Sequence, residues 1–166
     1  QDGFENIYFN AQINVNKIEF NGRVAGFELT VTTDKPYGYF KEQILTFQVP
    51  QNGSYSFVNL SDDIGRIPVS AAIKVLSSGT LDIKNSQTGT TFSLQNCVEN
   101  EVISFNSETK QITSNLPART TAELLKNFNF QWLYISNTRD SRKNTLTFSL
   151  PCKAAITYHP ICKISF

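Results

Sequence analysis

The sequence predicts an all-β fold, a β-sandwich or jelly roll of about ten short strands with one short linking helix near residues 120–128. Three observations predict it. Residues Ile7 to Val15 alternate apolar and polar side chains without a break, which is the period of a half-buried strand. Asn21-Gly22 and Asn52-Gly53 mark tight turns, because both residue types tolerate positive φ. A single segment carries a helix start signal.

The first strand has one apolar face, formed by Ile7, Phe9, Ala11, Ile13 and Val15. The apolar positions then change parity at Ile18 and Phe20, which predicts a β-bulge or a hinge near residues 16 and 17. With Asn21-Gly22 as the turn, a bulge there makes one long hairpin with the strand over 24–32. That register places Val15 opposite Phe27 and Ile13 opposite Leu29.

The other elements follow in chain order. Asn52-Gly53 predicts a second hairpin, which joins a strand over 43–49 to one over 54–60. Thr120 to Glu123 reads as a capping box ahead of Leu124, Leu125 and Phe128, and predicts a helix of about two turns. Further strands are predicted over 69–76, 80–83, 90–94, 101–105, 130–135, 145–150 and 154–166, the last interrupted at Pro160.

Composition limits the function. The 166 residues are 40% hydrophobic with 13 Phe, enough for the core of one domain. The net charge is +1 and only 17% of residues are charged, so nucleic acid is not an expected partner. No stretch reaches the apolar length of a membrane span, and no motif calls for a cofactor. The chain lacks Met and opens almost directly into a strand, which predicts an exported, extracellular or cell-surface protein whose leader has been removed.

Two interpretations of the first strand remain open. It pairs within its own subunit through the bulged hairpin, or residues 1–16 form an N-terminal strand donated to a neighbour while 17–166 form the sandwich domain. Donation uses a ladder of backbone hydrogen bonds, with alternate side chains in pockets, and head-to-tail addition generates a filament. In general form this is similar to donor-strand assembly in bacterial and archaeal surface fibres. The hypothesis is a secreted structural or adhesive filament subunit, pilus-like or thread-like, that self-associates.

The alternative function is a monomeric carbohydrate-binding module. Tyr37 and Tyr39 lie in an aromatic turn and are candidate glycan-binding residues, because exposed rings stack on the apolar face of a sugar. Trp132 also sits in a predicted strand, but we interpret Phe130 and Trp132 as core residues, with Tyr134 on the same face. A surface glycan is then the partner.

The remaining candidate sites are covalent or catalytic. Asn52 and Asn59 each begin an Asn-X-Ser triplet and are candidate N-glycosylation sites. Of the three cysteines, Cys152 and Cys162 flank a short segment and are predicted to form a disulfide, with Cys97 unpaired and buried; pairing of Cys97 with either one is the rival. His159 is the only His and no Cys-X-X-Cys spacing exists, so we expect neither a metal site nor an enzyme.

Overall fold

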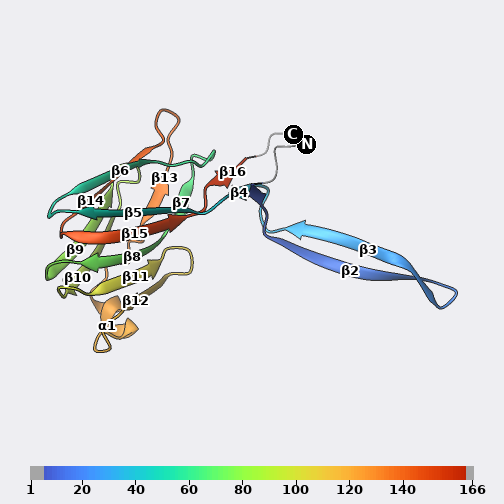
Figure 1. The fold of residues 1–166 in the computed structure, drawn as a ribbon, viewed down its shortest axis with the longest axis horizontal. Coiled ribbons are helices and arrows are strands. Elements are labelled where there is room, and N and C mark those ends of the chain that lie inside the picture. The colour runs from blue at the N-terminus through green and yellow to red at the C-terminus, as the bar shows by residue number, and fades with distance from the viewer. Residues whose placement is uncertain (1–5, 164–166) are drawn as a thin grey trace.

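The computed structural model describes residues 6–163. Its body is a sandwich of two antiparallel sheets (Figure 1), so the all-β prediction is confirmed. One sheet has five strands in the order β12-β11-β8-β15-β5, which are Gln111–Ser114, Val102–Asn106, Ser70–Val75, Cys152–Tyr158 and Gln43–Val49. The other has four in the order β10-β9-β14-β6, which are Thr91–Cys97, Gly79–Asn85, Lys143–Phe148 and Ser54–Val58.

Three smaller sheets and one helix complete the described chain. β13 (Tyr134–Ser136) pairs with β7 (Arg66–Pro68). A three-stranded sheet contains β1, β4 and β16, which are Ile7–Tyr8, Gly38–Phe40 and Ile161–Cys162. β2 (Ala11–Phe20) and β3 (Arg23–Thr33) pair with each other in a long hairpin that projects away from the sandwich (Figure 1). Within residues 6–163, α1 (Thr121–Lys126) is the one helix, and it is too short to cross a membrane.

The core lies between the two large sheets because alternate side chains of their strands point inward. Aromatic rings meet across this layer. Phe92 of β10 stacks on Phe105 of β11 with ring centroids 4.5 Å apart, and Phe47 of β5 packs edge-on against Phe148 of β14 at 5.7 Å. The central aliphatic residues are fully buried; they include Ile73, Leu81, Ile83, Leu94, Ile103, Leu133, Ile135, Leu146 and Ile156.

The helix begins where the capping box predicts. The Thr120 side chain accepts a hydrogen bond from the Glu123 backbone N–H at 3.3 Å, which satisfies one of the unpaired donors of the first turn. Leu124 is the buried residue of the helix. At the other end, the Asn127 amide donates to the Glu123 carbonyl at 2.8 Å, so the helix ends after Lys126.

The second Asn-Gly turn does not make a hairpin. β5 pairs with β15 while β6 pairs with β14, so residues 50–53 carry the chain from one sheet to the other. Asn52 has a φ of 55°, but Gly53 is not in the positive-φ region, and a type I′ hairpin turn needs both. The predicted 43–49 and 54–60 hairpin is therefore wrong, although the first of these strands has the bounds of β5.

The segment 130–135 also differs from its prediction. Phe130 has a φ of 59° and its side chain is exposed, so no strand begins there, and β13 starts at Tyr134. The buried residues are Leu133 and Ile135, of the opposite parity to the prediction, while Trp132 is partly buried against the core. The left-handed backbone at Phe130 and the irregular segment 131–133 mean that no strand runs through 130–133, so the period of two on which the parity argument rests does not apply there.

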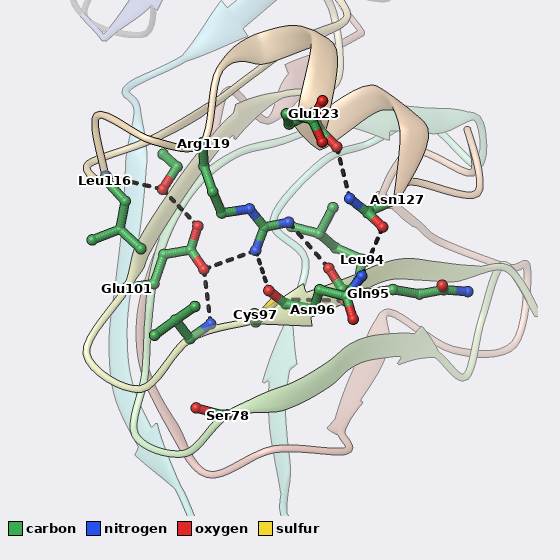
Figure 2. Close-up of polar contacts among 12 residues, drawn as sticks. Ser78, Leu94, Gln95, Asn96, Cys97, Glu101, Leu116, Arg119, Glu123 and Asn127 are labelled. Carbon is green, nitrogen blue, oxygen red and sulfur yellow. Dashed lines mark hydrogen bonds and ion pairs between the residues drawn. The ribbon is translucent and has the colours of Figure 1, made fainter.

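A buried ion pair closes the end of the sandwich beside α1. Figure 2 shows the Glu101 carboxylate facing the Arg119 guanidinium, with Nη1 of Arg119 at 2.9 Å from Oε2 of Glu101. Glu101 also accepts hydrogen bonds from the Val98 backbone N–H and the Ser114 hydroxyl. Arg119 donates to the backbone carbonyls of residues 95 and 96. The pair thereby ties the β10–β11 loop to the segment that leads into α1.

Candidate functional site: a projecting hairpin arm and the cleft at its root

The hairpin of residues 11–33, which we call the arm, is the most exposed part of the described chain. Residues 8–34 are exposed apart from the half-buried Gly26. Asn21 and Gly22 have φ values of 51° and 72°, so the first Asn-Gly pair forms the predicted tight turn. At the other end, the Asp34 N–H donates to the Asn10 carbonyl at 3.1 Å, which closes the base of the arm.

The bulge in the arm lies on the second strand. Phe20 faces Arg23 and Glu19 faces Val24, but Ile18 faces Gly26, so Ala25 is the extra residue. A single hairpin with a one-residue bulge is thus confirmed, but the bulge is not at residues 16 and 17, and the predicted pairing of Val15 with Phe27 and of Ile13 with Leu29 is wrong. Val15 lies opposite Leu29 and Ile13 opposite Val31. Because β2 continues without a break, Ile18 and Phe20 lie on the opposite face from Ile13 and Val15.

One face of the arm is apolar and uncovered. Two cross-strand pairs and the neighbouring Phe27 form this apolar stripe, whose exposed fractions are 60% for Ile13, 58% for Val15, 64% for Phe27, 63% for Leu29 and 60% for Val31. The reverse face carries Gln12, Asn14, Asn16, Glu28, Thr30 and Thr32 opposite the stripe, with the exposed Ile18 and Phe20 nearer the turn. An isolated two-stranded ribbon is marginally stable in water, so the stripe marks a surface that a partner would cover.

The root cleft lies where the arm joins the body. It has a volume of about 550 Å³, and both chain segments that flank the arm line it together with β7, Glu108 and the β15–β16 connection. Tyr37 and Tyr39 meet there edge to face, with centroids 5.7 Å apart. The structure brings both predicted ligand residues into one cleft, and their role in binding stays a prediction.

Charged side chains accompany these rings. The Lys35 ammonium lies 5.9 Å from the Tyr37 ring and 5.7 Å from the Tyr39 ring, within the range of a cation–π contact. The Tyr39 hydroxyl raises the pKa of Lys35, and burial raises the pKa of Tyr37. Nε2 of His159 is 3.5 Å from a Glu42 carboxylate oxygen. The sequence indicated only the two tyrosines: Lys35 and Glu42 flank them in the chain but carry no pattern that marks a site, and His159 comes from a distant segment.

The predicted N-terminal strand pairs within its own chain. In β1, Ile7 lies opposite Phe40 of β4. Ala11, Ile13 and Val15 lie in β2, and Phe9 lies between these two strands. The arm is residues 11–33, so the proposed division after residue 16 falls inside a continuous strand. Within the described chain the strand pairs with β3 and β4, and donation to a neighbouring subunit stays a prediction.

Of the two glycosylation candidates, only Asn52 is accessible. Asn59 is fully buried, and its side-chain oxygen accepts a hydrogen bond from the Ser61 N–H at 3.1 Å. A glycan cannot be attached to a buried amide without local unfolding, so the Asn59 prediction is wrong for the folded chain. Asn52 is exposed in its turn, and its modification stays a prediction.

The predicted disulfide is absent, and Cys97, Cys152 and Cys162 are all free and buried. Cys152 begins β15 beside Val49 and Val75, whereas Cys162 pairs with Gly38 beyond the other end of that strand. Seven strand residues at about 3.3 Å each separate the two ends, too far for a disulfide. The prediction assumed that the last strand folds back beside Cys152, but β16 joins β4 instead.

The free thiols give a testable prediction. Burial raises the pKa of all three, and that of Cys152 to about 12. At pH 8 the Cys152 thiolate fraction is then about 10⁻⁴, so a disulfide-exchange reagent should react with it very slowly in the native protein. We expect three equivalents of thiol after denaturation and almost none in the fast native phase. A single equivalent after denaturation without reductant would indicate a disulfide.

Comparison with known proteins identifies the family. The sequence profile described as "Phage tail C-terminal domain" matches residues 37–158. The chain belongs to this family. The match covers the sandwich of this phage tail domain and begins after the arm. No curated protein matches the chain.

A solved structure is similar to the phage tail domain. It is the SPP1 Dit (gp 19.1) protein, described as a paradigm of the hub adsorption apparatus in phages that infect Gram-positive bacteria. The TM-score is 0.54 at 12% sequence identity, and the alignment covers 92% of this chain and 59% of the other. At this identity the similarity concerns the fold alone, and the chain spans about three-fifths of that protein's length.

Proposed function

We propose that this phage tail domain is a structural subunit, without enzymatic activity, that assembles with further copies of itself through the arm. Family membership and the β-sandwich support a β-rich structural protein of a phage tail. They do not favour a pilus or a carbohydrate-binding module as such. The observation that carries the self-assembly proposal is the uncovered apolar stripe. Self-assembly of a tail subunit does not require export to the cell surface, which stays a prediction from the sequence.

Burial of the apolar stripe would favour association, but the free energy it supplies is not enough for a stable contact by itself. Full burial of one such side chain is worth about 1.5–3 kcal/mol. Five that start about 60% exposed would then contribute roughly 5–9 kcal/mol. Association costs about 4–15 kcal/mol in lost freedom. A stable contact therefore needs more than the stripe.

Two further features supply such contacts. Among the described strands β2 and β3 pair only with each other, so each has an outer edge with unpaired backbone groups that can extend a sheet. On the body, Val58, Leu60 and Ile64 are exposed at the end of β6 and just after it. β6 is itself an edge strand. We infer that the arm of one copy packs at the β6 edge of the next, a head-to-tail contact that gives a ring if the rotation closes.

The test compares two charge pairs on opposite faces of the arm. The double variant Val15→Lys with Leu29→Glu replaces a facing pair in the stripe. The control, Asn14→Lys with Thr30→Glu, replaces the adjacent facing pair on the polar side. Opposite charges on facing positions preserve the hairpin in both. Sedimentation velocity should give oligomers for the wild type and the control, and monomers for the stripe variant.

Two outcomes would contradict the proposal. One is a wild type that stays monomeric at every protein concentration. The other is a stripe variant that assembles as the control does. Circular dichroism of both variants checks that the sandwich remains folded.

A further inference from the structure

We propose that the root cleft is a saccharide-binding site. This inference is independent of assembly through the arm, because the cleft and the apolar stripe share no residue. A volume of about 550 Å³ lies within the usual range of small-ligand sites, about 300–1,000 Å³. It would accept a short stretch of a sugar chain.

The aromatic side of the cleft suits the apolar face of a pyranose. Tyr8 and Tyr39 are directly opposite each other on β1 and β4, so their side chains leave the same face of the small sheet. Tyr37 adds a third ring, edge to face with Tyr39. Tyrosine combines a broad apolar face with a hydroxyl that can bond a polar ligand. Three such rings from two segments line one side of the cleft, which neither segment would do alone.

The polar side of the cleft suits sugar hydroxyl groups. The amide of Asn10, the carboxylate of Glu108 and the guanidinium of Arg66 line it. None of these three side chains hydrogen-bonds to another residue within 6–163. Planar amide, carboxylate and guanidinium groups can each engage two hydroxyls at once. A ligand rich in hydroxyl groups would satisfy both the donors and the acceptors.

The charges of the lining favour a neutral ligand over a polyanion. Three cationic side chains, of Lys35, Lys41 and Arg66, are interspersed with the carboxylates of Glu42 and Glu108. A nucleic-acid or polyphosphate groove would instead be lined with one sign of charge. The mixture of both signs over tyrosine rings matches a neutral saccharide.

The test uses a defined panel of neutral oligosaccharides. The full chain is first applied to immobilised di- to tetrasaccharides of hexoses and N-acetylhexosamines. The strongest binder is then titrated by NMR, and we expect the shifted amides to map to the residues around Tyr39. Tyr37→Ala should weaken binding about tenfold or more, while Tyr37→Phe, which keeps the ring, should stay within about threefold of wild type.

Controls keep the proposal falsifiable. Phe130→Ala removes an exposed aromatic ring outside the cleft and should leave binding unchanged. Where Tyr37→Ala proves unfolded by circular dichroism, Arg66→Ala replaces it, because that side chain is exposed. The proposal is overturned when no oligosaccharide binds or when Tyr37→Ala or Arg66→Ala binds as the wild type does. It is also overturned when the shifts appear only in the monomeric stripe variant, since the cleft would then belong to the contact between copies.

Discussion

Glu101→Ala should lower the free energy of unfolding by about 3–5 kcal/mol, the usual cost of removing one partner of a buried ion pair. The Glu101 side chain is fully buried, and that of Arg119 is only 11% exposed. The substitution leaves the guanidinium without its counter-charge in a water-poor site. It also removes the acceptor of the Val98 N–H and of the Ser114 hydroxyl, and such orphaned donors add to the cost.

Urea denaturation followed by tryptophan fluorescence measures this effect. Glu99→Ala is the matched control, because Glu99 lies two residues earlier in the same loop with an exposed side chain; it should change stability by less than about 0.5 kcal/mol. The double variant Glu101→Ala with Arg119→Ala should cost less than the sum of the single variants, since the charge left unpaired by one is removed by the other. A loss below about 1 kcal/mol for Glu101→Ala would mean that the pair contributes little to the fold.

The sandwich strands were predictable because two packed sheets impose a strict period of two. β5 alternates Leu45, Phe47 and Val49 toward the core, and its predicted bounds, Gln43–Val49, are those observed. The turn at Asn21-Gly22 and the cap at Thr120 were predictable for a different reason. Each depends on the backbone conformation and hydrogen bonds of about four consecutive residues, which the rest of the chain does not alter.

Sheet membership could not be predicted from the same local signals. Asn52-Gly53 has a hairpin sequence, yet the flanking strands join different sheets, because packing across the core decides which strands pair. The same holds for Cys152 and Cys162, whose separation depends on β16 joining β4. Asn59 belongs to a set of fully buried asparagines that includes Asn85 and Asn144. A prediction from residue type alone would place these polar side chains at the surface.

The candidate site was predictable in part. The sequence singled out the apolar positions of the first strand and the tyrosines at 37 and 39, which are features of the arm and of the root cleft. It did not reveal that β2 projects as an amphipathic ribbon, because an alternating pattern is equally typical of a strand against a core. It also missed Arg66, Glu108 and His159, which reach the cleft from separate strands and loops.

The arm depends on a close contact at its root, which gives the last prediction. Gly38 of β4 is buried, and a Cβ atom there would lie 2.5 Å from Cγ2 of Ile7 and 3.1 Å from Cζ of Phe9. Its φ is not in the left-handed region, so the constraint is space and not backbone strain. Ile7 would have to move, and with it β1, which leads directly into the arm. Gly38→Ala should therefore cost about 1–3 kcal/mol, as overpacking usually does.

Gly26→Ala is the matched control, because Gly26 lies in β3 and a Cβ there meets nothing within 4 Å. Gly26 also pairs with Ile18 on the face of the arm opposite the apolar stripe. Gly26→Ala should therefore change stability by less than about 0.5 kcal/mol and leave assembly unchanged. Hydrogen exchange should detect the difference at the β1–β4 ladder, where Gly38→Ala is expected to speed exchange of the amides that pair Ile7 with Phe40. Equal stability and equal protection in the two variants would show that β1 does not anchor the arm to the body.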